Sequence, residues 1–123
     1  MITKIGQVMV YVNDLEAVKQ FWIKYLDFEV ISEMKNEHMH WIELAPKGAA
    51  TTIVLHNKEA IAKMSPELNL GTPSLMFHTN QFDELYHRLT SSNITVGDIM
   101  ELPSGRVFNF ADIESNYFAV MEV

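Results

Sequence analysis

The stretch VYVNDLEAVKQFWIKYLDFEV, residues 10–30, has the pattern of a strand end, a helix and the start of a second strand. Asn13 offers a helix N-cap, with Glu16 three residues later as in a capping box. Apolar residues then recur at steps of three and four, as on the buried face of a helix: Leu15, Val18, Trp22 and Leu26. The pattern predicts an amphipathic helix over residues 14–26.

Short strands are predicted on both sides of this helix. Residues 5–12 are rich in Val, Ile and Met, which is typical of a largely buried strand. After the helix, the turn-like segments KNEH and PKGA separate three apolar runs, at residues 28–33, 39–45 and 51–57. The first half of the chain therefore has the predicted order β-α-β-β-β.

The second half repeats this order. TPSLMFHTN, residues 72–80, predicts a strand. Asn80, the counterpart of Asn13, is predicted to cap a helix with Phe82, Leu85 and Leu89 on one face. The segments ITVGDIME, GRVFNFAD and NYFAVMEV predict three further strands.

The two halves align at a nearly constant shift. A shift of 67 residues pairs Met9 with Met76, and by the last strands the shift is 65, which pairs Val54 with Ala119. A repeat of this length indicates two similar modules. We expect a single domain made of three parts: module one (1–57), a linker (58–71) and module two (72–123).

The linker is polar and is broken at Pro66 and Gly71, with room for a short helical turn at Glu59–Met64. Two interpretations stay open for it. It is a plain connector, or it is a flap over a cleft, as long loops often are.

Composition indicates a globular protein and excludes several functions. The chain has 123 residues, 48% hydrophobic and 20% charged, which suffices for one core. Its net charge of −7 argues against nucleic acid or an anionic membrane as the partner. The absence of cysteine excludes disulfides and zinc–sulfur sites. Because neither a secretory signal nor a run of about 18 apolar residues is visible, we expect a cytoplasmic protein.

Two stretches carry a resemblance to a known family. Residues 10–30 contain an Asp-led helix with paired aromatic residues and a Leu-Asp-Phe turn, in which Asp27 replaces the family's glycine. FADIESNYFAVME, residues 110–122, is similar to the family's Asp-Pro-x-Gly-Asn hairpin and last strand, with Ile113 and Ser115 replacing Pro and Gly. Together with the repeat, the chain resembles the vicinal oxygen chelate superfamily, which includes glyoxalase I, bleomycin-resistance proteins, fosfomycin-resistance transferases and extradiol dioxygenases. The resemblance implies an α+β fold, in which two βαβββ modules form a cupped mixed sheet around a central cleft.

The resemblance also implies where a metal would bind. Metal-binding members take their ligands from the first and last strand of each module. In this chain those positions fall on Gln7, Val54, Ser74 and Ala119. The valine and alanine side chains have no lone pair, and one amide with one hydroxyl is too weak a set for a divalent cation. We therefore expect neither the family metal site nor any other cofactor.

Residues two apart along a strand share a face with these positions. This register predicts a cleft wall of Met, aromatic and polar side chains, and an opposite face of pure core that includes Val10, Ile42 and Phe110. Adaptable apolar walls with a few polar groups suit a small organic ligand. The predicted ligand-binding residues are Gln7, Met9, Tyr11, Trp41, Glu43, Thr52, His56, Ser74, Met76, His78, Asn109, Tyr117 and Met121.

The leading functional hypothesis is a metal-free binding protein of the glyoxalase/bleomycin-resistance type. It holds a small, flat or partly cationic molecule and sequesters a drug or a metabolite. Its partner is thus a small organic ligand rather than nucleic acid or a membrane. By analogy with the family, we expect a homodimer.

Several alternatives stay open. If Glu43, His56 and His78 converge, they form a shifted site for a metal-dependent lyase, isomerase or dioxygenase-like enzyme. His38 and His40 share a strand face and can chelate an ion, although an exposed turn is the better interpretation. In a third class of function, the cleft is vestigial and the protein has an interaction or structural role. Arg106, next to a turn, is predicted to stay in solvent.

Overall fold

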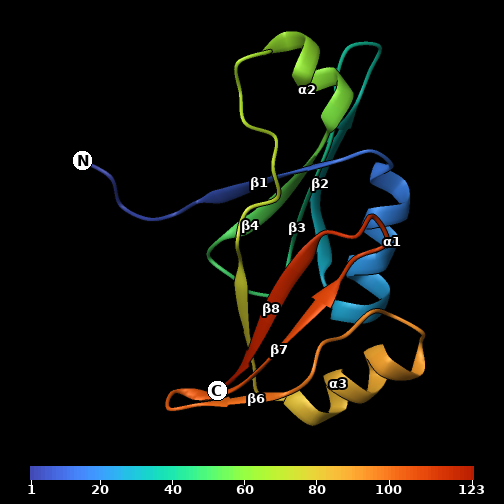
Figure 1. Ribbon diagram of the computed structural model, residues 1–123. Coiled ribbons are helices and arrows are strands. Elements are labelled where there is room, and N and C mark those ends of the chain that lie inside the picture. Colours follow the sequence, from blue (N-terminus) through green and yellow to red (C-terminus); the bar gives the residue numbers. More distant parts are fainter. The chain divides into compact units, whose positions relative to one another are not determined.

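The computed structural model describes residues 1–123, and the chain divides into two compact units, residues 1–73 and 74–123. Each unit contains a four-stranded mixed sheet (Figure 1). Within each unit the elements follow the order β-α-β-β-β, with one extra helix after the fourth strand of the first unit. The predicted α+β class with two βαβββ modules is confirmed. No helix in the chain is long and apolar enough to cross a membrane.

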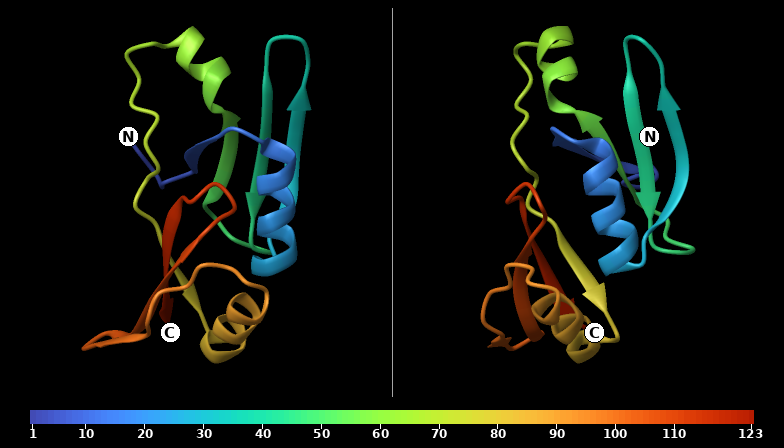
Figure 2. Two further views of the ribbon diagram at one scale, coloured as in Figure 1. Left: turned by 45° about the vertical axis from the view of Figure 1, so that its right-hand side comes forward. Right: turned by 90° about the vertical axis from the view of Figure 1, so that its right-hand side faces the viewer.

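The sheet of the first unit has the strand order β1-β4-β3-β2. β1 runs parallel to β4, and the other neighbours are antiparallel. Figure 2 shows α1 lying along one side of this sheet. The elements are β1 (Gln7–Val12), α1 (Leu15–Leu26), β2 (Glu29–Lys35), β3 (His40–Ala45), β4 (Thr52–Asn57) and α2 (Lys58–Met64).

Helix α1 begins and ends at aspartates. The side chain of Asp14 accepts a hydrogen bond from the Ala17 amide, so Asp14 and not the predicted Asn13 is the N-cap. At the other end Asp27 has φ 57°, the left-handed conformation that favours glycine. This conformation accounts for the glycine that the family resemblance leads one to expect at position 27. The buried helix positions are Leu15, Val18, Phe21 and Trp22.

The sheet of the second unit has the order β5-β8-β7-β6, again with its first and last strands parallel. Its elements are β5 (Met76–Thr79), α3 (Phe82–Ser91), β6 (Met100–Leu102), β7 (Gly105–Ala111) and β8 (Tyr117–Glu122).

Three predicted details of the second unit are wrong. Of the segment predicted as a strand at 72–80, only β5 forms a strand. Of the segment predicted at 94–101, only the last two residues belong to a strand, β6. Residues 95–97 instead follow β7 loosely, through one bridge and two backbone hydrogen bonds, and regular pairing with β7 begins only at Met100. Asn80 does not cap α3, whose first boundary residue is Gln81 and has no side-chain cap.

The strand register confirms the repeat at the level of single residues. Met9 pairs with Val54 in the first sheet, and Met76 pairs with Ala119 in the second. These are the positions that the 67- and 65-residue shifts relate. The antiparallel pairs agree as well, because Glu43 pairs with Val54 as Asn109 pairs with Ala119. The two modules therefore repeat the same alternation of faces.

One face of each sheet forms the core, as the alternation predicts. The side chains there are almost entirely hidden from solvent, and burial of each large aliphatic or aromatic group contributes roughly 1.5–3 kcal/mol. In the first unit they include Val10, Val12, Ile42, Leu44 and Leu55. In the second they include Leu89, Phe108, Phe110, Phe118 and Val120.

Arg106 fastens α3 to the second sheet. Its Nε and Nη2 donate to the Glu122 carboxylate at 2.9 and 2.8 Å, and Nη1 and Nη2 donate to the two Asp83 oxygens at 3.1 Å. The guanidinium carbon lies 4.5 Å from the Phe82 ring centroid. Hydrogen bonding to Arg106 lowers the pKa of both carboxyl groups. The prediction of a solvated Arg106 is wrong, because its partners come from elements that only the fold brings together.

The hairpin between β7 and β8 depends on Asp112, which is 6% exposed. Its carboxylate accepts hydrogen bonds from the Glu114 and Asn116 amides, each at 2.9 Å, and from Asn116 Nδ2 at 3.0 Å. Ser115 has φ 62°, a left-handed conformation that favours glycine, the residue that the family resemblance leads one to expect here. A single carboxylate thus holds this turn in shape.

Replacing Asp112 by Ala leaves these donors without an acceptor, so we expect the free energy of unfolding to fall by about 2–3 kcal/mol. Urea denaturation followed by circular dichroism measures the change. Ile113→Ala is the matched control, since Ile113 is 55% exposed in the same turn. It should change the free energy by less than about 0.5 kcal/mol. Equal losses in the two variants would contradict this role of Asp112.

Candidate functional site

The sheet of the first unit carries a mixed set of side chains on the face opposite α1, which we call the Glu43 face. The strand register places these residues together, because directly paired residues share a face. None of the strands contributes a lysine or arginine to this face. Its members are Gln7, Met9, Tyr11, Ser32, Met34, Trp41, Glu43, Thr52, Val54 and His56, with Glu29 at the start of β2.

Glu43 is the centre of the polar part of this face. Its Oε2 accepts hydrogen bonds from Thr52 Oγ1 at 2.6 Å and Gln7 Nε2 at 3.2 Å. Its Oε1 accepts one from Ser32 Oγ at 2.9 Å. The donors lie on three strands, and they lower the pKa of the Glu43 carboxyl because they stabilise its ionised form. Glu43 is therefore a fixed carboxylate at neutral pH.

Beside this cluster lies a group of apolar and aromatic side chains. The Tyr11 and His56 rings stack with centroids 6.0 Å apart, and His56 Nε2 lies 3.3 Å from Met9 Sδ. Trp41 is the direct β3 partner of His56. Burial lowers the pKa of His56, which is thus neutral at pH 7.

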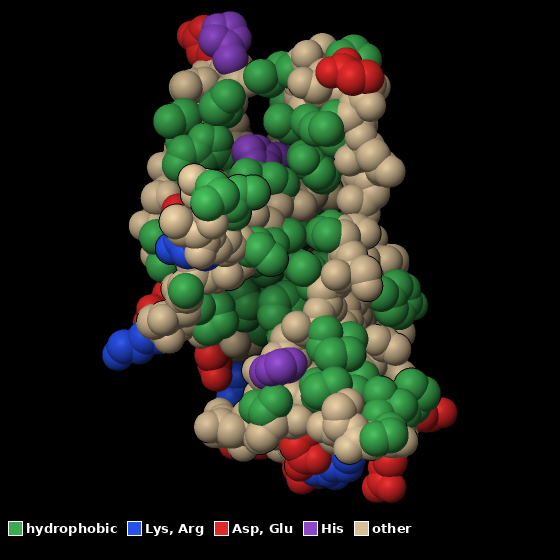
Figure 3. Space-filling model, turned by 90° about the vertical axis from the view of Figure 1, so that its left-hand side faces the viewer, with side chains coloured by type: hydrophobic (Ala, Val, Ile, Leu, Met, Phe, Trp, Pro, Cys, Tyr) green, Lys and Arg blue, Asp and Glu red, His purple; other side chains and the backbone are tan.

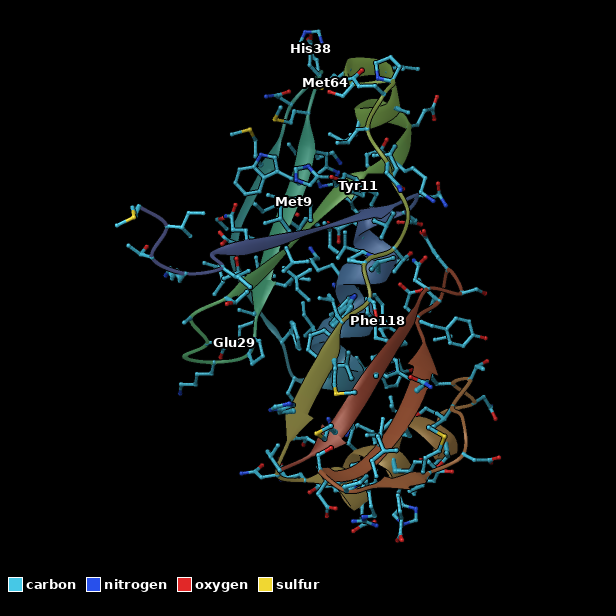
Figure 4. The ribbon with its side chains drawn as sticks, turned by 60° about the vertical axis from the view of Figure 1, so that its left-hand side comes forward. Met9, Tyr11, Glu29, His38, Met64 and Phe118 are labelled. Carbon is cyan, nitrogen blue, oxygen red and sulfur yellow. The ribbon has the colours of Figure 1, made fainter.

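Figure 4 shows Met9 and Tyr11 along β1. The space-filling view shows hydrophobic side chains gathered around a histidine in the upper half of the molecule (Figure 3). Met9 remains 38% exposed. The Glu43 face thus presents apolar surface next to a fixed anion.

The second unit has a groove of its own, about 580 Å³ in volume. Of the predicted site residues, Ser74, Asn109 and Tyr117 line it. Met76, His78 and Met121 belong to the same sheet face by register but do not line the groove. The full lining is Ser74, Leu75, Thr95, Val96, Gly97, Asn109, Tyr117, Phe118 and Ala119.

Sequence reasoning missed the segment Thr95–Gly97 on this groove. It was predicted to be part of a regular strand, whereas it crosses beside β7 with Gly97 donating to the Asn109 carbonyl at 2.7 Å. The glycine at 97 was the available signal, since glycine inside a strand pattern often marks a close backbone approach.

Two members of the predicted shifted site, Glu43 and His56, have different partners within the first unit. Glu43 is bonded to Gln7, Ser32 and Thr52, whereas His56 contacts Met9 and Tyr11. No hydrogen bond joins Glu43 to His56. The third member of the predicted shifted site, His78, belongs to the second unit.

The two histidines of the segment EHMH, residues 37–40, have different surroundings. His38 lies at the exposed tip of the β2–β3 hairpin (Figure 4), as predicted. His40 begins β3 and lies on the α1 side, so an exposed turn was the wrong interpretation for it. Its imidazole belongs to a cluster with Glu16 and Glu33, in which one ligand atom from each residue lies within 4.8 Å of the others.

This cluster already contains a cation. Lys19 Nζ lies 2.8 Å from Glu16 Oε2 and 3.7 Å from Glu33 Oε1. The hydrogen bond between Lys19 and Glu16 raises the lysine pKa and lowers the glutamate pKa. The group therefore acts as an ion pair that links α1 to β2.

The four family metal positions do not fit a divalent ion. Gln7 offers an amide whose nitrogen donates to Glu43, and Val54 is 4% exposed with no donor atom. Ser74 offers a neutral hydroxyl, and Ala119 offers nothing. Without a carboxylate or imidazole, the set cannot offset the dehydration of the ion.

Thr52 is the closest donor to Glu43, which allows the source of the pKa shift to be tested. Thr52→Val keeps the side-chain shape but removes the hydroxyl, so the pKa of Glu43 should rise towards its ordinary value. Carbon-detected NMR titration of the Glu43 carboxyl measures it. Thr51→Val is the control, because the Thr51 hydroxyl donates to the Ile5 carbonyl instead. An unchanged pKa in Thr52→Val would refute the assignment.

The lowered pKa of Glu43 makes the stability of the protein depend on pH. Because the folded pKa of Glu43 is lowered, its contribution is present above the unfolded pKa, and it is lost as the pH falls through the folded pKa. The stability difference between wild type and Thr52→Val should therefore shrink as the protein is acidified below about pH 4. Thermal unfolding between pH 7 and pH 3 measures it. A difference that does not change with pH would contradict this linkage.

Comparison with known proteins gives a consistent result. Residues 4–117 match the family described as the Glyoxalase/Bleomycin resistance protein/Dioxygenase superfamily. The chain is 30% identical over 124 residues to Uncharacterized protein YetH of Bacillus subtilis (strain 168), covering 99% of this chain and 100% of that protein.

Solved structures agree with this result. TnmS3, an antibiotic binding protein from Streptomyces sp. CB03234, is similar with a TM-score of 0.83 and 26% identity, covering 98% of this chain and 96% of that one. The fosfomycin resistance protein FosX from Listeria monocytogenes has a TM-score of 0.74 at 16% identity, covering 100% and 95%, and so shows the fold alone.

Proposed function

Because the chain belongs to the Glyoxalase/Bleomycin resistance protein/Dioxygenase superfamily, we propose that it is a binding protein for a small organic molecule. It sequesters a drug or a metabolite without using the family metal positions. Catalysis is not part of the proposal. A homodimer in the cytoplasm remains the expectation for the assembled protein, and light scattering tests the dimer.

The observation that carries the proposal is the composition of the Glu43 face. Met9, Tyr11, Trp41 and His56 supply an apolar surface, and methionine adapts its shape to different ligands. Next to them, Gln7 and Glu43 supply polar groups in fixed positions. Small-molecule sites combine these two features, because apolar contact gives affinity and a few polar groups give orientation.

The chemistry of the charged groups favours binding over turnover. A general acid or base works best with a pKa near the operating pH. The donors around Glu43 move its pKa away from that range, and His56 is neutral with its Nε2 against a thioether. The named property of TnmS3, antibiotic binding, supports the same class of function.

Acridine, a flat apolar molecule that is neutral at pH 7.5, should bind to the protein and change the emission of Trp41. The chain has only two tryptophans, and Trp22 is fully buried on the core-facing side of α1. In Trp41→Phe, the remaining tryptophan emission should not respond to acridine, once the light absorbed by acridine itself has been corrected for. Fluorescence anisotropy of acridine measures binding independently in both proteins. If neither acridine nor its cationic derivative 9-aminoacridine binds when the protein is titrated to millimolar concentration, the proposal is contradicted.

Elemental analysis tests the second part of the proposal. Protein purified from cells without chelator should contain less than one nickel, zinc, iron or manganese per chain, because the family positions lack suitable donors. Incubation with EDTA should then leave acridine binding unchanged. One tightly held ion per chain, with binding lost after chelation, would contradict the proposal and favour the metal-dependent enzyme instead.

A further inference from the structure

We infer that the Glu43 face selects aromatic ligands that carry a positive charge and an N–H donor, with the Glu43 carboxylate as the partner of that group. This inference rests on the proposed function and names the class of ligand. It concerns the first unit alone.

The first argument is the free acceptor capacity of Glu43. A carboxylate has about four lone-pair sites, two on each oxygen. Oε2 already accepts from Gln7 and Thr52, whereas Oε1 accepts only from Ser32. One site on Oε1 is left, on a group whose position is fixed by three strands. A ligand that donates a hydrogen bond completes the set.

The second argument is charge. The three donors to Glu43 are an amide and two hydroxyls, so they orient the carboxylate without neutralising it. Lys35 is the only lysine or arginine in the four strands, and it pairs with His40 on the α1 side. His56 is neutral, and Glu29 adds a second negative charge at the edge. A cationic ligand supplies the counter-charge that the protein lacks there.

The third argument is the position of the aromatic side chains. Trp41 lies two residues from Glu43 on the same face of β3, which is roughly 7 Å along a strand. A flat ligand of two or three rings reaches that far. Its ring then contacts Trp41 and its charged nitrogen lies over the carboxylate, so both cation–π attraction and a charge-assisted hydrogen bond are available.

The combination of a carboxylate and an aromatic ring at these two positions is absent from the second unit. The strand register makes Asn109 the counterpart of Glu43, and Val107 the counterpart of Trp41. An amide and a valine provide neither the charge nor the aromatic ring. The repeat has therefore diverged at the two positions on which recognition of a cation depends.

The test compares three tricyclic molecules at pH 7.5. Acridine is neutral, N-methylacridinium is cationic without an N–H, and 9-aminoacridine is cationic with N–H donors. Anisotropy titrations should show 9-aminoacridine binding about tenfold more tightly than acridine, the size of a charge-assisted hydrogen bond. N-methylacridinium should lie between them. Added salt should reduce the difference.

Two variants test whether the Glu43 carboxylate causes the preference for 9-aminoacridine over acridine. Glu43→Gln keeps the shape of the side chain and removes its charge, so the ratio of the two affinities should fall to about one while acridine still binds. Glu37→Gln removes the same charge from the exposed hairpin tip, where the side chain is 92% exposed, and should keep the tenfold ratio. Retained acridine binding also shows that Glu43→Gln is folded.

Each outcome decides between the proposals. Equal affinity of the wild type for acridine and 9-aminoacridine overturns this inference and leaves the proposed function standing. A tenfold ratio that survives Glu43→Gln overturns it as well. If none of the three molecules binds, both the proposed function and the inference fail.

Discussion

The parallel pairing of the first and last strand of each module is the constraint on which the rest of the structure depends. It places Met9 beside Val54 and Met76 beside Ala119. Because side chains alternate, a shift of one residue would exchange the two faces of a sheet. The fully buried residues on the helix side, such as Val10 and Phe110, make such a shift costly. Core packing therefore also determines which side chains the opposite face presents.

What that face can do follows from how its polar groups are satisfied. Glu43 is held by donors from β1, β2 and β4, so its carboxylate is a rigid feature of the sheet. A fixed anion beside Met9 and Trp41 offers orientation and apolar contact at small cost in side-chain entropy. The same donors lower its pKa, which removes it from the range useful for proton transfer. The fixed position of the Glu43 carboxylate and its lowered pKa thus have one physical cause.

The sequence predicted the fold well because its signals were local and repeated. Strand alternation and the step of three and four in α1 set the faces, and the repeat predicted the register of both sheets. The errors were at element ends, where Asp14 replaces Asn13 as the cap and β6 is reduced to three residues. The networks around Arg106 and Glu43 were not predictable, because their members lie 9 to 36 residues apart in the chain.

Methionine methyl NMR tests the central claim most directly, since the protein has eight methionines and Met9 lies on the Glu43 face. Ring currents from a bound aromatic ligand shift nearby methyl signals, and Met→Leu variants assign them. We expect 9-aminoacridine to shift the Met9 signal strongly and the Met64 signal of α2 hardly at all. An unchanged Met9 signal while the dye is shown to bind would place the ligand elsewhere and contradict the account.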